Sequence, residues 1–152
     1  MTDLATIRPD EWNIALFVHV LGAFALVGAL VVAGSYLFLA RRGGSIELVR
    51  AGYRSLWMAA LPAYVIARVG AQWIASEEGL DDSDAAWIGL GYISTDAGLL
   101  LLLGATLAAG LALRRADGPT VSGRGVAIAA WIVALLVVVY AVVIWAMATK
   151  PV

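Results

Sequence analysis

Apolar residues fill four long stretches of the chain, and short segments rich in glycine or charged residues separate them. The stretches cover residues 13–40, 46–76, 96–113 and 125–148. A helix needs about 20 residues to cross a hydrocarbon layer about 30 Å thick, and each stretch approaches or exceeds that length. None alternates apolar and polar positions as the strands of a membrane barrel do. The pattern therefore predicts an all-α fold, in which residues 1–152 form one transmembrane domain built as a four-helix bundle.

The beginnings of two predicted helices each have two interpretations. Residues 46–57 place apolar side chains on one face and charged side chains on another, which predicts an amphipathic extension near the lipid headgroups or a solvated first turn. Residues 87–94 favour a segment lying on the membrane before Ser94, Thr95 or Asp96 caps the third helix. The alternative is that they form the first turns of that helix. Pro62 predicts a kink in the second helix, because its ring clashes with the carbonyl of Met58.

Charged residues predict the orientation of the bundle. The segments 41–54 and 114–124 carry seven arginines against two acidic residues, whereas segment 77–95 carries five acidic residues and no basic one. Short basic loops stay in the cytoplasm. We therefore expect 41–54 and 114–124 to be cytoplasmic, and 77–95 and both termini to lie outside. The first helix is expected to be retained, because residues 1–12 lack the basic region of a signal peptide and the apolar run is too long for one.

Composition agrees with a membrane protein and narrows its chemistry. Hydrophobic residues make up 62% and charged residues 14%, against roughly half and a quarter in soluble domains. With a net charge of −1, no basic surface points to nucleic acid. The absence of cysteine excludes disulfides and thiol chemistry, and a single histidine excludes most protein-only zinc or copper sites. We expect a multi-pass protein of the bacterial plasma (inner) membrane, surrounded by the lipid bilayer.

Small residues recur along the first helix and predict a packing face. Gly22, Ala25, Ala29 and Ala33 follow one another at spacings of three and four, which lets another helix come close. His19 falls on the same stripe and is expected to face protein instead of lipid. Through this stripe we expect a homo-oligomer or a contact with a partner membrane protein.

Polar side chains inside the apolar stretches fall at similar depths. At a rise of 1.5 Å per residue, His19 lies ~9 Å below the outer boundary and Arg68 ~12 Å below it. Ionisable residues in a membrane are costly and rare, so each needs a physical reason. A spacing of four also places two neighbours of Arg68 on its face of the second helix. The candidate ligand-binding pocket, opening outward, comprises His19, Tyr64, Arg68, Gln72, Asp96 and Tyr140.

Each of these residues also has a purely structural interpretation. Arg68 can pair with Asp96 or with a lipid phosphate and do no more than fix two helices. His19 can hydrogen-bond a neighbouring helix, and Asp96 can cap the helix that it begins. The two tyrosines can be packing residues with satisfied hydroxyls.

The sequence does not favour an enzyme. It lacks a Gly-x-Ser-x-Gly elbow, a phosphate-binding loop and a second membrane carboxylate for aspartyl chemistry. It also lacks the mid-membrane carboxylate in the first helix that proton-coupled export by small four-helix transporters requires. A single chain offers one imidazole, so a haem with two histidine ligands would need a dimer.

The first helix carries a resemblance in residues 17–22 (Phe-Val-His-Val-Leu-Gly), Gly28 and the basic pair at 41–42, and Leu61-Pro62 fits it too. This half of the chain resembles small, uncharacterised four-helix integral membrane proteins of bacteria. They are distantly similar to the copper-resistance CopD domain and to HemJ-type proteins of the haem pathway. The resemblance implies the four-helix fold and matches His19 to a histidine that is linked to haem or copper in those relatives.

Three functions follow as expectations. The first is a non-enzymatic structural or accessory subunit that associates through the stripe on the first helix. The alternative is a carrier of a haem- or quinone-type ligand, in which His19 contacts the ligand and Arg68 binds an acidic group of that ligand. A weaker alternative is a small transporter built from a dimer.

Overall fold

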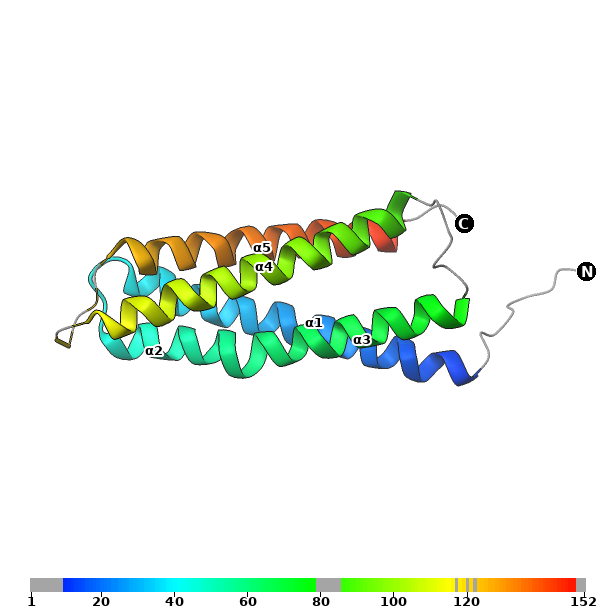
Figure 1. The fold of residues 1–152 in the computed structure, drawn as a ribbon, viewed down its shortest axis with the longest axis horizontal. Helices are drawn as coiled ribbons and strands as arrows, with labels where there is room; N and C mark the ends of the chain where they lie inside the picture. The colour runs from blue at the N-terminus through cyan, green and yellow to red at the C-terminus, as the bar shows by residue number, and fades with distance from the viewer. Residues whose placement is uncertain (1–9, 79–85, 117, 120, 122, 150–152) are drawn as a thin grey trace, which may run out of the picture.

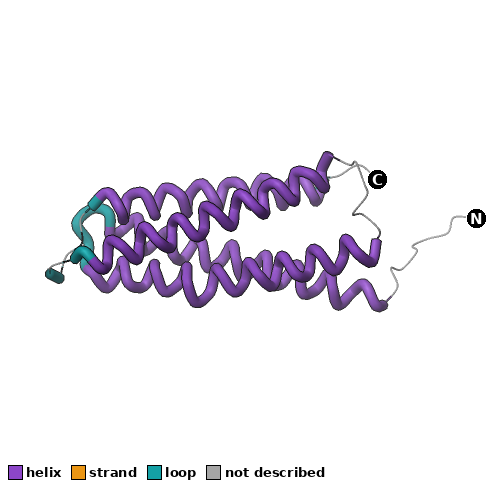
Figure 2. The backbone as a smooth tube through the Cα atoms, viewed as in Figure 1, coloured by secondary structure: helices purple, strands orange, loops and turns teal. Residues whose placement is uncertain are grey.

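The structure, a computed structural model, describes residues 10–78, 86–116, 118–119, 121 and 123–149. Its helices are α1 (Asp10–Ala40), α2 (Ile46–Arg54), α3 (Leu61–Glu78), α4 (Ala86–Arg114) and α5 (Arg124–Ala148), with a π-helical turn η1 (Ser55–Ala60) between α2 and α3. Figure 2 shows that helices account for nearly all of the described chain. Four stretches, 14–40, 46–77, 91–114 and 124–146, are helical, long and apolar enough to cross a membrane. The prediction of an all-helical protein with four membrane-length helices is confirmed.

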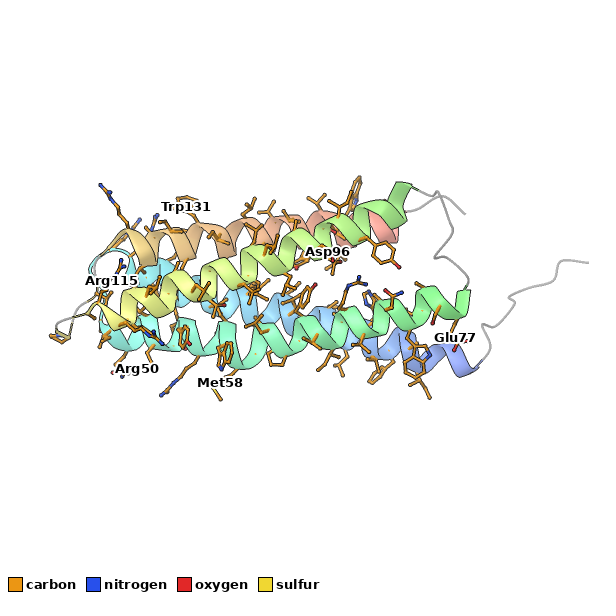
Figure 3. The ribbon with its side chains drawn as sticks, in the orientation of Figure 1. Arg50, Met58, Glu77, Asp96, Arg115 and Trp131 are labelled. Carbon is orange, nitrogen blue, oxygen red and sulfur yellow. The ribbon has the colours of Figure 1, made fainter. Side chains whose placement is uncertain are left out.

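The four long elements run antiparallel along one axis (Figure 1). Helices α2 and α3 join through η1 into a single rod beside α1, and α4 lies beside α5. The beginning of α1 and the end of α5 lie at the same end of the bundle as the end of α3 and the beginning of α4, here called the terminal end. The opposite end holds the α1–α2 and α4–α5 connections and is called the arginine end. Figure 3 shows Arg50 and Arg115 there, with Glu77 and Asp96 towards the terminal end.

The core is continuous at the arginine end and opens towards the terminal end. Helix α1 packs extensively against α3 and α5, and α4 packs against α5, whereas α3 and α4 contact each other at few positions. The largest fully buried side chains are Leu30, Leu37, Leu56, Leu102, Leu136, Val49, Val126 and Val133. Large side chains therefore fill the centre and the arginine end. The weak α3–α4 contact leaves room between the helices nearer the terminal end.

Helices α1 and α3 cross in backbone contact. A Cβ atom added to Gly22 would lie 2.5 Å from the nitrogen of Ala67, and one added to Gly70 would lie 2.6 Å from the nitrogen of His19. Such close approach is open only to glycine, and it maximises van der Waals contact between membrane helices. The sequence analysis identified Gly22 but missed Gly70. The crossing needs both.

Most of the predicted small-residue stripe packs within the chain itself. Gly22, Ala29 and Ala33 are buried, whereas Ala25 is exposed. The neighbour that the stripe admits is therefore the chain's own α3 and η1. For example, Ser55 Oγ donates a hydrogen bond of 2.9 Å to the carbonyl of Ala29. A second chain would have to use another face of α1.

The π-helical turn has a local cause in Pro62. Proline has no N–H to donate to the carbonyl of Met58 and its ring crowds that carbonyl, so a regular α-helix cannot continue through this position. The helix widens just before the proline, where the N–H of Leu61 bonds to the carbonyl of Leu56, five residues back. The predicted irregularity thus takes the form of a π-helical turn. The apolar face of residues 46–57 belongs to the core, with Val49 and Leu56 fully buried.

The third membrane helix differs from the sequence prediction. Helix α4 begins at Ala86, so residues 87–94 form its first turns and the favoured interfacial segment is wrong. The predicted cap at Ser94, Thr95 or Asp96 is wrong for the same reason. The hydroxyls of Ser94 and Thr95 donate back to the carbonyl of Gly91 instead, at 3.0 and 2.6 Å. This local bonding inside a helix satisfies both hydroxyls without ending the helix.

Candidate functional site

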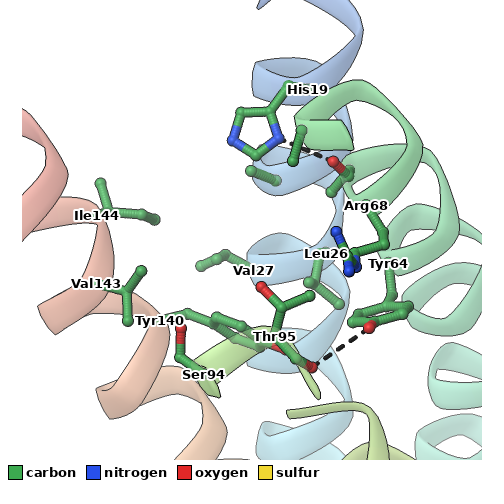
Figure 4. A pocket seen from close by; sticks show the side chains of 13 residues that line it. His19, Leu26, Val27, Tyr64, Arg68, Ser94, Thr95, Tyr140, Val143 and Ile144 are labelled. Carbon is green, nitrogen blue, oxygen red and sulfur yellow. Dashed lines mark hydrogen bonds between the residues drawn. The ribbon is translucent and has the colours of Figure 1, made fainter. Parts of the chain in front are cut away.

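A pocket of about 90 Å³ lies where α1, α3, α4 and α5 separate near the terminal end (Figure 4). Its lining is mostly apolar, and the small side chains of Ala23, Ala67 and Ala71 leave much of the space. The other lining residues are His19, Leu26, Val27, Tyr64, Arg68, Ser94, Thr95, Tyr140, Val143 and Ile144. An apolar cavity with a few convergent polar groups is the usual form of a small-molecule site.

One ring nitrogen of His19 makes a hydrogen bond to α3, and the other faces the pocket. Its Nδ1 lies 2.8 Å from the carbonyl oxygen of Ala67 on α3. A carbonyl can only accept, so Nδ1 carries the hydrogen and donates it. In the neutral imidazole the other nitrogen, Nε2, then has a lone pair and acts as an acceptor. Figure 4 shows this second nitrogen on the side of the ring facing away from Ala67, towards the side of the pocket that Ile144 lines.

Tyr140 also lines this pocket, and its hydroxyl is buried. Its oxygen is shielded from solvent and has no hydrogen-bond partner among the residues that the structure describes. Gly98 on α4 makes room for it, because a Cβ there would overlap the hydroxyl. Leaving a buried polar atom unpaired costs about 1–3 kcal/mol, and a ligand that bonded to this hydroxyl would recover that cost.

Tyr64 ties α3 to α4 below the pocket. Its side chain is buried, and its hydroxyl donates a hydrogen bond of 3.3 Å to the carbonyl of Thr95. Thr95 and the preceding Ser94 line the pocket from α4. The sequence analysis considered these two only as helix caps. The available signal was the spacing of four between Ser94 and Gly98, which places them on one face of α4.

Arg68 turns towards α4 and spans the rim of the pocket. Its guanidinium donates to Gln72 Oε1 at 3.1 Å, lies 5.1 Å from the ring centroid of Tyr92 and approaches Asp96 Oδ1 to 4.0 Å. The Asp96 side chain is 72% exposed, so the ion pair is a weak link between the helices. Arg68 therefore places positive charge and hydrogen-bond donors at the mouth of the pocket, held by several weak contacts.

The structure brings the six predicted residues together in two groups. His19, Tyr64, Arg68 and Tyr140 line one pocket. Gln72 and Asp96 do not line it and meet Arg68 at its rim. Asp96 lies within α4 and does not begin a helix, contrary to the sequence prediction.

Comparisons of the chain with protein-family models, with curated proteins and with solved structures give no match. The resemblance of the first helix to CopD-like and HemJ-type proteins therefore stays a prediction. The function has to be argued from the site itself.

The residues around the pocket do not fit a resident copper ion or haem. The described part of the chain contains no group of three or more His, Cys, Asp or Glu side chains that could hold a metal. A haem is at least as large as a drug-sized ligand, and pockets for such ligands measure about 300–1,000 Å³. The cavity of about 90 Å³ is several times smaller. It suits a ligand with one ring, or the polar end of a longer molecule.

Proposed function

We propose that this protein is a multi-pass membrane protein that binds and carries a small lipid-soluble ligand between its helices. The observation that carries the proposal is the hydroxyl of Tyr140, which is buried beside the pocket and bonds to no residue that the structure describes, together with the Nε2 atom of His19, which faces the pocket. No catalytic group is assigned. The proposal takes up the carrier alternative from the sequence and leaves out haem.

The energetics of the membrane favour a ligand at this place. Bulk water, which could bond to an unpaired polar atom, is absent from the hydrocarbon region. A ligand that donates to His19 Nε2 and pairs with the Tyr140 hydroxyl therefore replaces a costly arrangement with a satisfied one. The remaining apolar lining, such as Leu26, Val27 and Val143, contributes through burial of the ligand's apolar surface.

The pocket is open to lipid on one side. Ile144 lines it and yet has 50% of its surface exposed, so part of the wall is also part of the outer surface of the bundle. A ligand with an apolar tail can leave its tail among the lipids while its polar end reaches His19 and Tyr140. Entry from the membrane requires no aqueous path.

The accessory-subunit function has less structural support. It relied on the stripe of small residues on α1 as a contact for a partner protein. Gly22, Ala29 and Ala33 of that stripe are buried within the chain. A partner would have to dock on large lipid-facing side chains such as Phe17 and Phe24, which any membrane helix presents to lipid.

We propose that the bundle lies in the bacterial plasma membrane with its terminal end outside. The support comes from charge: arginines gather at the opposite end, and short basic segments stay in the cytoplasm. In this orientation the pocket is in the outer half of the membrane.

Blocking the pocket tests the proposal. Ala71 lines the cavity, and Ala71→Phe puts a ring into space of about 90 Å³. Ala141 follows Tyr140 on α5 but is exposed, so Ala141→Phe adds the same side chain on a lipid-facing surface. Organic extraction of the detergent-purified proteins, followed by mass spectrometry, should recover one compound in near-stoichiometric amount from the wild type and from Ala141→Phe. Ala71→Phe should lose it, because the ring fills the site.

Circular dichroism and gel filtration of the three proteins serve as controls for folding. A wild-type extract that contains only bulk lipids, in the same proportions as the extract of Ala71→Phe, would contradict the proposal. So would a specific compound that Ala71→Phe retains in full.

A further inference from the structure

The pocket presents two polar groups that differ in the hydrogen bonds they can make. With Nδ1 bonded to the carbonyl of Ala67, the neutral His19 ring can only accept at Nε2. The hydroxyl of Tyr140 can donate or accept and has no partner among the described side chains. A matching ligand must therefore offer a hydrogen-bond donor at one end and a group that can pair with a hydroxyl at the other.

The contacts between helices hold these two groups on different sides of the pocket. His19 packs on Gly70 of α3, and Tyr140 packs on Gly98 of α4, one turn from the carbonyl of Thr95 that Tyr64 bonds. His19 therefore enters the pocket beside α3 and Tyr140 beside α4, so a ligand between them meets polar groups held by different helices.

The lining and the size of the pocket favour an aromatic ring. An apolar cavity of about 150 Å³ is known to hold benzene, so the present volume of about 90 Å³ takes at most one ring, part of which would lie in the open side of the pocket. The side chains of Tyr64 and Tyr140 offer ring contacts, and the Arg68 guanidinium can lie over a ring face. The lipid-exposed wall at Ile144 gives an apolar tail a way out.

From these constraints we propose that the pocket binds a lipid-soluble hydroquinone and prefers it to the corresponding quinone. One hydroxyl of the hydroquinone donates to His19 Nε2, and the other pairs with the hydroxyl of Tyr140. A quinone carbonyl can only accept, so it leaves Nε2 unpaired while still accepting from Tyr140. The proposal concerns binding, rests on the carrier function proposed above and names its ligand class.

The test uses a hydroquinone with a ten-carbon alkyl chain and its oxidised quinone as probes. Binding to the full-length protein in lipid nanodiscs is measured by titration calorimetry at pH 8 without oxygen. The wild type should bind the hydroquinone about tenfold more tightly than the quinone, the effect of one net hydrogen bond.

Two variants separate the roles of the polar groups. In His19→Asn the amide nitrogen takes the place of Nδ1 and can still donate to Ala67, but Nε2 is missing. This variant should lose the preference for hydroquinone. Tyr140→Phe should weaken both probes by a similar factor and should fold normally, because the hydroxyl that it removes bonds to no described residue. Tyr36→Phe, on an exposed part of α1 away from the pocket, is the control and should bind as the wild type does.

Equal affinity for the two probes, or unchanged binding by both variants, would overturn the hydroquinone assignment. If neither probe binds while Ala71→Phe still loses an extracted compound, the ligand class is wrong and the carrier function stands. If neither probe binds and no compound depends on Ala71, both proposals fail.

Discussion

Replacing Gly70 by leucine should prevent the chain from folding as a stable bundle, whereas replacing Gly28 by leucine should leave it folded. A side chain at Gly70 would meet backbone atoms of His19 at 2.6–2.7 Å, so α1 and α3 would have to move apart along their whole crossing. Overpacking usually costs about 1–3 kcal/mol and sometimes more. Here the obstacle is main chain, which cannot rotate away, and we expect a cost at or above the top of that range.

The Gly28 variant is a matched control for this experiment. It lies on the same pair of helices, and a Cβ there meets nothing within 4 Å. Both substitutions replace a helical glycine and gain about the same helix propensity, close to 1 kcal/mol. Thermal unfolding followed by circular dichroism in one detergent should give a midpoint at or above that of the wild type for Gly28→Leu and aggregated or unfolded protein for Gly70→Leu. A wild-type midpoint for Gly70→Leu would contradict the close crossing.

The second large effect concerns orientation, and it is expected to be all or none. The chain has no cysteine, so a single introduced cysteine reports its own location. Glu77 is exposed at the terminal end, and Gly118 is exposed in the α4–α5 connection at the arginine end. In intact bacterial cells a small, membrane-impermeant maleimide should label Glu77→Cys and should not label Gly118→Cys. After the membrane is disrupted, both should react.

The basis of this expectation is the uneven distribution of charge. Seven arginines lie in the segments 41–54 and 114–124, and short segments with this excess remain in the cytoplasm. Labelling of Gly118→Cys but not Glu77→Cys in intact cells would reverse the orientation. The pocket would then lie in the inner half of the membrane, and a ligand would reach it from the opposite leaflet.

The sequence predicted the spans of the helices well because hydropathy acts over about twenty residues at a time. A stretch such as 125–148 has few alternatives once its backbone is in lipid. The start of the third helix was wrong because residues 87–94 are short and contain two glycines, so local preference is weak there. In the structure they continue α4 without a break at Asp96.

Four of the six polar residues that line the pocket could be predicted, in part because of the periodicity of helices. Tyr64 and Arg68 share a face of α3 at a spacing of four, and the cost of charge in a membrane identified Arg68 and His19 as exceptional. The rotation of one helix against another is not encoded in such local patterns. For this reason the pocket positions of Ser94 and Thr95 on α4, and the contact of Gly70 with α1, became visible only in the structure.

The close crossing of α1 and α3 also fixes the hydrogen bond of His19. Gly70 lets α3 approach the backbone of α1 at His19, and this approach brings the carbonyl of Ala67 within 2.8 Å of Nδ1. Packing and site chemistry are therefore coupled: the contact that holds α1 to α3 also decides which ring nitrogen faces the pocket. A variant that loosens the crossing should lose ligand binding together with stability.

The most direct test of the carrier function is ¹⁵N nuclear magnetic resonance of His19. The chain contains a single histidine, so its imidazole nitrogens are the only histidine signals and need no assignment. At pH 8 in nanodiscs, Nδ1 should show the shift of a protonated nitrogen and Nε2 that of an unprotonated one. Addition of the ten-carbon hydroquinone should move the Nε2 signal towards that of a hydrogen-bonded acceptor and leave Nδ1 in place. A proton on Nε2 in the free protein, or an Nε2 signal that neither the hydroquinone nor an extract of the host membrane shifts, would contradict the account.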